Sequence, residues 1–321
     1  MLVTRYNNDA VCCFVSCRNG SGSKVFKRLA YTEPKTVVQA IPVESAESVV
    51  RPVGWSSERI GRAFLAGGSL FGIGSLCYYG LGLSGETGAL DKARFWPSYV
   101  KDRIQSTYTY FASGLAITAV SAYGASRSSS FIRFMANRPI LAMVTCFAAT
   151  IGSSLLVIAT PYTPETLPLK IGAFTLFSAV MGATLAPVIL MAGPVVGRAA
   201  MYTAAVVGGL SLTAACAPSE KYLYMAGPLS VGLGVVLVAS LGGMFATPGT
   251  ALFSGLQTVV VYGGLVLFGA FMLFDTQKII YHAENRTSFD PANMSLGIYM
   301  DTINIFIRIL TILTNSNSRK K

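Results

Sequence analysis

Two aspartates stand inside apolar sequence near the C-terminal end of the chain. Asp275 interrupts the run GLVLFGAFMLFDTQKII, and Asp301 interrupts the run SLGIYMDTINIFIRILTIL. Ionisable side chains are costly within a membrane span, and by default they indicate function. Two carboxylates in contact cannot both ionise cheaply, so they would share a proton and titrate as a pair. Carboxylate oxygens also bind Ca²⁺, so protons and Ca²⁺ would compete for one site.

The second aspartate belongs to a regular stripe of polar residues. Its members step by three or four along the chain: Asp301, Asn304, Arg308, Thr311 and Asn315. On an α-helix this spacing places all of them on one face. The stripe therefore predicts a helix that lines a polar cavity inside a bundle. A helix that lies at the membrane surface is the alternative interpretation.

The two aspartates have matching positions in their predicted helices. Asp275 lies about six residues before the expected helix end near Tyr281, and Asp301 lies about six residues after the expected start near Ser295. At 1.5 Å per residue, each lies ~9 Å from the same membrane surface. Because consecutive helices run in opposite directions, we expect the two carboxylates to meet at one level.

Basic residues near the aspartates give a second interpretation. Lys278 shares a helical face with Asp275 and His282, and Arg308 lies on the stripe of Asp301. If each aspartate is neutralised by one of these cations, the pair only fixes helix packing. The sequence leaves both interpretations open.

The composition indicates that the helices holding these residues lie in lipid. Of the 321 residues, 52% are hydrophobic and only 12% are charged, against about a quarter in soluble domains. A span needs about 20 mainly apolar residues, and eight runs meet this requirement. The runs are 62–83, 104–125, 139–159, 171–192, 199–217, 226–246, 257–280 and 296–314. We therefore predict an all-α polytopic membrane protein surrounded by the lipid bilayer.

Several classes of function are not expected. The net charge of +11 comes from basic residues in the N-terminal segment, the loops and the tail, so membrane topology explains it better than nucleic acid binding. His282 is the single histidine, which disfavours zinc sites and histidine-dependent catalysis. The aspartates also lack the YD and GxGD motifs of intramembrane aspartyl proteases. We expect no enzyme activity, no nucleic acid partner and no cofactor, with Ca²⁺ and H⁺ as transported ions.

The segments that flank the membrane region have their own compositions. Residues 1–32 are basic, contain serine and hold few acids, which is typical of a mitochondrial transit peptide; a disordered basic tail is the alternative. Prolines and scattered acids in 33–60 indicate a linker. The rest is predicted to form an additional transmembrane helix, a loop, a seven-helix core and a basic tail. Their ranges are 61–83, 84–103, 104–314 and 315–321.

Four segments resemble the Bax inhibitor family of membrane proteins. VYGGLVLFGAFMLFDTQKII is similar to that family's signature, and IYMDTINIFIRIL is similar to its last helix. KIGAFTLFSAVMGATLAPVIL and MAGPLSVGLGVVLVASLGGMF resemble its middle helices. The similarity covers roughly residues 100–314. The additional first span, the basic N-terminus and the tail resemble a mitochondrial inner-membrane member of the family.

The resemblance implies both a fold and a function. The fold is a bundle of seven core helices with the last surrounded by the others, preceded here by one additional span. The function is a pH-sensitive Ca²⁺ leak or Ca²⁺/H⁺ exchange controlled by Asp275 and Asp301, linked to apoptosis control, cristae organisation and cytochrome c retention. The alternative is a non-transporting inner-membrane scaffold that binds protein partners, shapes cristae and retains cytochrome c.

One element of the family's gating scheme is missing. In some members an arginine near the end of the second core helix latches the first aspartate, but the matching segment IATPYTPETLPLK has no arginine. The latch is therefore absent or comes from another cation. Candidates for the latch or the polar lining are Lys170, Lys278, Arg308 and Asn304.

Positive charges predict the orientation. With eight full spans, both termini face one side, which carries eleven Lys and Arg residues after the transit peptide against eight on the other side. This bias favours the matrix for both termini. If the last helix re-enters instead of spanning, the tail moves and the count reverses. In either case the aspartates lie toward the intermembrane-space side.

Overall fold

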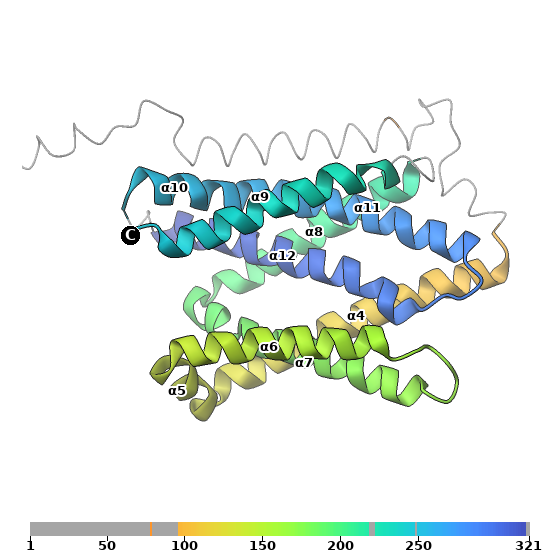
Figure 1. Ribbon diagram of the computed structural model, residues 1–321, viewed down its shortest axis with the longest axis horizontal. Coiled ribbons are helices and arrows are strands. Elements are labelled where there is room, and N and C mark those ends of the chain that lie inside the picture. The colour runs from red at the N-terminus through yellow and green to blue at the C-terminus, as the bar shows by residue number, and fades with distance from the viewer. Residues whose placement is uncertain (1–77, 79–95, 218–221, 248, 319–321) are drawn as a thin grey trace, which may run out of the picture. The chain divides into compact units, whose positions relative to one another are not determined.

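Helices form all the regular structure of the described residues in the computed structural model (Figure 1), which are Tyr78, 96–217, 222–247 and 249–318. The predicted transit peptide 1–32 and linker 33–60 lie outside these residues. Apart from Tyr78, so does the predicted additional span 61–83.

The helices follow one another with short connections. In chain order they are α4 Ser98–Arg127, α5 Ser129–Asn137, α6 Pro139–Ala159, α7 Leu167–Ala192, α8 Val195–Cys216, α9 Ala226–Phe245, α10 Ala251–Thr258, α11 Gly264–Asn285 and α12 Pro291–Ser318. A 3₁₀ turn at Leu223–Met225 leads into α9, and a π-helical turn at Val259–Gly263 joins α10 to α11.

Local signals explain several of the boundaries. Pro139 is the first residue of α6, where the missing N–H has no intrahelical partner to lose. The side chain of Ser128 accepts a hydrogen bond from the backbone N–H of Phe131 and caps α5. Gly193, with a φ of 55°, ends α7 in a conformation that favours glycine.

Within the described part of the chain, six helical segments are long and apolar enough to cross a membrane. They are Pro139–Ala159, Leu167–Ala192, Val195–Cys216, Leu223–Phe245, Ala251–Asn285 and Pro291–Ser316. Large apolar side chains cover their outer surface, such as Phe147 on α6, which is 69% exposed, and Phe245 on α9, which is 89% exposed. Such a surface suits lipid and not water. The prediction of an all-α polytopic membrane protein is confirmed.

The predicted boundaries differ from the helices in three places. The run 104–125 corresponds to α4, which is more polar than the six spans and begins at Ser98, inside the predicted loop 84–103. Pro97 comes directly before it, where proline is tolerated at a helix start. Helix α12 continues to Ser318, inside the predicted tail 315–321, because no glycine or proline stops it. The short helix α5 occupies a stretch predicted as a loop.

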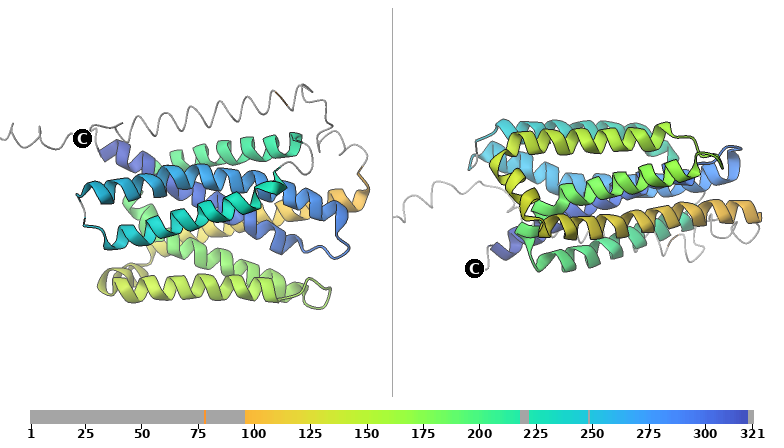
Figure 2. Two further views of the ribbon diagram at one scale, coloured as in Figure 1. Left: turned by 45° about the horizontal axis from the view of Figure 1, so that its top comes forward. Right: turned by 90° about the horizontal axis from the view of Figure 1, so that it is seen from below.

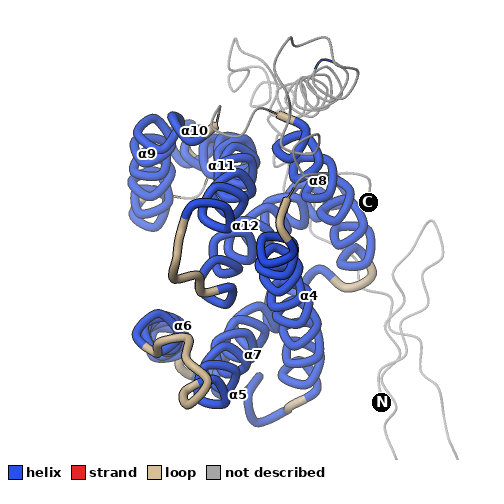
Figure 3. The backbone as a smooth tube through the Cα atoms, turned by 90° about the vertical axis from the view of Figure 1, so that its right-hand side faces the viewer, coloured by secondary structure: helices blue, strands red, loops and turns tan. Residues whose placement is uncertain are grey.

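The last helix occupies the middle of the bundle. Figure 3 shows α12 with α4, α8 and α11 around it, and these are the helices it packs against most extensively. Helix α7 packs along α4 and α6, while α9 packs beside the continuous segment formed by α10 and α11 (Figures 1 and 2). For the described helices, the expected arrangement with the last helix surrounded by the others is confirmed.

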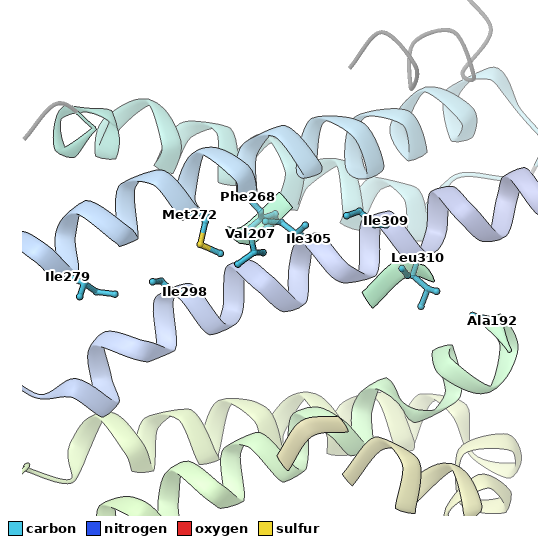
Figure 4. Close-up of a cluster of buried hydrophobic side chains, with 10 residues drawn as sticks. Ala192, Val207, Phe268, Met272, Ile279, Ile298, Ile305, Ile309 and Leu310 are labelled. Atoms are coloured by element: carbon cyan, nitrogen blue, oxygen red, sulfur yellow. The ribbon is translucent and has the colours of Figure 1, made fainter. Parts of the chain in front are cut away.

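A hydrophobic cluster joins α12 to its neighbours. Phe268 and Met272 of α11 pack with Ile298 and Ile305 of α12 and with Val207 of α8 (Figure 4). Met272 and Ile305 are completely buried. This close packing holds the relative positions of α11 and α12, which carry the two aspartates.

Candidate cation site between helices α11 and α12

The two aspartates lie at corresponding positions in an antiparallel helix pair. Asp275 precedes the end of α11 at Asn285 by ten residues, and Asp301 follows the start of α12 at Pro291 by ten residues. Each is therefore about 15 Å along its helix from the connecting loop, deeper than the ~9 Å expected. The difference arises because both helices extend four residues beyond the expected ends near Tyr281 and Ser295.

Asp275 rests against a glycine of the neighbouring helix. A Cβ atom added to Gly297 of α12 would collide with Oδ2 of Asp275. Gly297 precedes Asp301 by four residues, which is about one helical turn. Asp275 therefore contacts α12 about one turn before Asp301 in the sequence, and the two carboxylates interact electrostatically. Gly297 allows this close approach because it has no side chain.

Asp301 is buried without full hydrogen bonding. The residue is 6% exposed, and among the described residues its Oδ2 atom has no hydrogen-bond partner. Its electrostatic neighbours are Asp275 and Lys278. A buried carboxylate oxygen without a donor is unfavourable, and native proteins hold few such groups. This oxygen is available to a proton or to a metal cation.

Lys278 is the candidate latch that lies near the aspartates. Its Nζ atom is 3.9 Å from Oδ1 of Asp275, three residues earlier on the same helix. The lysine side chain is 40% exposed, and its Nζ also lies 5.7 Å from the ring centre of Phe274. A contact this long and exposed is a loose ion pair. Asp275 therefore has a basic partner in Lys278, whereas among the described residues Asp301 has no ion pair within 4.0 Å.

Lys170 does not latch the aspartates, because its ammonium group binds elsewhere. Fully buried, it donates to the backbone carbonyls of Val157 at 2.7 Å and Thr160 at 2.8 Å, at the end of α6. It also donates to Oδ2 of Asp290 at 2.6 Å and to Oδ1 of Asn293 at 2.9 Å, at the start of α12. Lys170 thus ties α7 to the end of α6 and to the beginning of α12.

Arg308 and Asn304 pair with each other and not with the aspartates. Nη1 of Arg308 donates to the backbone oxygen and to Oδ1 of Asn304, both at 3.0 Å. The guanidinium carbon lies 4.5 Å from the ring centre of Phe268. Asn304 in turn donates from Nδ2 to the carbonyl of Met300 at 2.9 Å. From Asp301 to Thr311 the predicted polar stripe lies inside the bundle, whereas Asn315 is exposed. Because α12 packs against α4, α8 and α11, the alternative of a helix at the membrane surface is wrong.

The residues on the two helical turns before Asp301 were not predicted to belong to the site. Asn293 and Gly297 precede Asp301 in steps of four, so they extend the polar stripe back to the start of α12. Asp290 accepts from the backbone N–H of Asn293 at 3.0 Å and caps the helix. The Asp-Pro pair at 290–291 was a signal for this helix start.

The donor set of the site is small. Among the described residues, no group of three or more His, Cys, Asp and Glu side chains is placed to hold a metal ion. Ca²⁺ takes six to eight oxygen ligands. An ion at Asp275 and Asp301 would therefore complete its shell with backbone carbonyls or water.

Fold and sequence together define a class of protein. Residues 100–318 match the family described as inhibitor of apoptosis-promoting Bax1, Bax1-I. The chain belongs to this Bax inhibitor family of polytopic membrane proteins.

Particular relatives come from animals and bacteria. The chain is 48% identical to rat growth hormone-inducible transmembrane protein over 269 residues, which cover 82% of this chain and 78% of the rat protein. It is 31% identical to human Bax inhibitor 1 over 54% of this chain and 73% of the human protein. It is also 28% identical to an uncharacterised Campylobacter jejuni protein, over 67% of this chain and 89% of that protein.

Proposed function

We propose that this protein is a Ca²⁺ transport protein of the mitochondrial inner membrane that uses Asp275 and Asp301 as its ion site. It acts as a pH-sensitive Ca²⁺ leak or as a Ca²⁺/H⁺ exchanger, not as an enzyme. The observation that carries the proposal is the buried carboxylate of Asp301, which has one oxygen without a donor and a second carboxylate as its neighbour. Such a pair accommodates either protons or a divalent cation.

The mechanism follows from this competition. Protons on the two carboxylates remove the negative charge that attracts Ca²⁺, whereas Ca²⁺ at the pair displaces protons. Lys278 has to move away from Asp275 for the ion to bind, and its long, exposed contact makes that movement cheap. Flux is therefore expected to fall as the pH falls.

The composition of the N-terminal segment and family membership support the cellular setting of the proposal. The transit-peptide composition of residues 1–32 supports mitochondrial import. The family description, inhibitor of apoptosis-promoting Bax1, supports a role in apoptosis control. We also propose that both termini lie in the matrix, and that the protein contributes to cristae organisation and binds inner-membrane protein partners.

Reconstituted protein provides the test. Purified full-length protein is placed in liposomes that contain a Ca²⁺ dye, with a set pH on each side. Asp275→Asn and Asp301→Asn are expected to abolish Ca²⁺ flux and its pH dependence, because each removes a charged ligand. Glu165→Gln, which changes an exposed carboxylate in the loop before α7, is the matched control and is expected to keep both.

Unchanged Ca²⁺ flux in both asparagine variants would overturn the ion site. A wild-type protein that carries no Ca²⁺ would favour the scaffold alternative. In that case both variants would keep the protein complexes and cristae shape of the wild type in cells, whereas loop or N-terminal truncations would lose them.

A further inference from the structure

Arg308 is a partly buried cation whose hydrogen-bond partners are all neutral. Its Nη1 donates to two oxygens of Asn304, and its guanidinium lies over the Phe268 ring. Nε is buried and, in the described part of the chain, has no hydrogen-bond partner. No described carboxylate lies within 4.0 Å of this guanidinium. Its charge is therefore not cancelled locally.

The guanidinium reaches back along α12 toward the aspartates. Arg308 follows Asp301 by seven residues, and the bond to Asn304 returns its charged end by about one turn. Asn304 is three residues from Asp301, or ~4.5 Å along the helix axis. Gly264 of α11 leaves room for the guanidinium, because a Cβ atom there would collide with Nε.

The two other cations near the stripe differ from Arg308 in pairing or exposure, although Lys278 is the cation that lies nearest to Asp275. Lys170 is 2.6 Å from the carboxylate of Asp290, so the two charges cancel. Lys278 is 40% exposed, and solvent screens its charge. Arg308 thus combines an uncancelled charge with burial and a position on the stripe of Asp301.

We propose that Arg308 is a fixed counter-cation that sets the affinity of the aspartate pair for divalent cations. The inference rests on the proposed Ca²⁺ function. An ion with two charges is repelled by the guanidinium twice as strongly as an ion with one. Arg308 therefore lowers the affinity for Ca²⁺ more than the affinity for Na⁺, and so acts as a specificity-determining residue.

Coulomb's law gives the size of the effect. At a separation of about 10 Å and an effective dielectric constant near 20, removing one positive charge strengthens the binding of a divalent ion by roughly one hundredfold, and salt reduces this to roughly tenfold. The binding of a monovalent ion changes by about the square root of that factor. A purely structural change in the site would not produce this dependence on ionic charge.

The test compares half-saturating concentrations in liposomes. Arg308→Gln is expected to lower the half-saturating Ca²⁺ concentration for flux by roughly tenfold, and to change Na⁺ competition less. Arg308→Lys keeps the charge and is expected to resemble the wild type. Arg127→Gln is the matched control, since Arg127 is remote on α4 and donates to Tyr123.

A second variant covers the case in which Arg308→Gln does not fold. Asn304→Asp keeps the side-chain shape and places a carboxylate beside Nη1, so it cancels the charge without removing the arginine. It is also expected to lower the half-saturating Ca²⁺ concentration. If the folded variants leave Ca²⁺ affinity unchanged or weaker while Asp301→Asn abolishes flux, this inference is wrong and the proposed function stands. If the wild type carries no Ca²⁺, the proposed function itself fails.

Discussion

Two buried charged groups differ in how fully they are hydrogen-bonded. Lys170 of α7 contacts the start of α12, and Asp301 lies about two turns further along that helix. The Lys170 ammonium, held by Asn293 and three other acceptors at 2.6–2.9 Å, has more partners than it has protons to donate. Asp301 has an oxygen with no donor among the described residues. Saturated contacts give a rigid joint, because every lost bond would leave a buried polar group unpaired. The oxygen of Asp301 without a donor is the one that the proposed function assigns to a proton or a cation.

Removing the Lys170 ammonium is expected to have the largest effect on the stability of the protein. Lys170→Met removes the cation and leaves Asp290 and two carbonyls without their partner, which costs about 3–5 kcal/mol of stability. Thermal unfolding of the detergent-solubilised protein measures the loss. Adding Asp290→Asn to this variant removes the unpaired charge and is expected to recover part of the stability. Equal stability of Lys170→Met and the wild type would show that the joint is not structural.

Filling the space at Gly297, where α12 contacts Asp275 of α11, is expected to have the next largest effect on stability. In Gly297→Ala the new methyl group occupies the position of the Asp275 carboxylate, so one of the two has to shift. Overpacking of this kind costs about 1–3 kcal/mol. We expect both lower thermal stability and weaker Ca²⁺ flux. Gly243→Ala on α9 is the control, because a Cβ atom there meets nothing within 4 Å.

Removing the charge of Asp301 is not expected to lower the stability, in contrast to removing the charge of Lys170. Asp301→Asn removes a poorly satisfied buried charge and should leave stability unchanged or raise it by about 1 kcal/mol. Thermal unfolding near neutral pH tests this, with Lys170→Met as the contrasting variant. A loss of several kcal/mol in Asp301→Asn would mean that this carboxylate has a structural role.

The smallest effect is expected at Lys278. Its contact with Asp275 is long and exposed, so Lys278→Gln should change stability by less than about 0.5 kcal/mol. Ca²⁺ flux should rise modestly, because a competing cation is gone. A strong loss of stability in unfolding measurements would show that Lys278 is a firm latch after all.

The elements of the site could be predicted because their signals are local. The spacing of Asp301, Asn304 and Arg308 defines one helix face without any tertiary information. The equal positions of Asp275 and Asp301 in their helices followed from chain direction alone. The contact between Asp275 and Gly297 could not be predicted, because it depends on how α11 packs along α12.

The contacts of Lys170 could not be predicted from the sequence. Lys170 and Asp290 are 120 residues apart, and no periodicity links them. A lysine beside apolar sequence fits a loop position as well as a buried one, since its burial depends on acceptors supplied by other elements. Its assignment as a candidate latch was therefore not correct.

The π-helical turn at Val259–Gly263 joins α10 and α11 into one continuous segment and changes the direction in which the side chains of α11 point. The N–H of Gly264 bonds to the carbonyl of Val259, five residues back instead of four. One additional residue rotates the following helix by about 100° relative to the preceding one. Helix α10 packs against α9, whereas α11 packs most extensively against α12 and α8 and also contacts α9. Deleting a single residue from this turn is therefore expected to rotate Asp275 away from its present contact with Gly297 of α12.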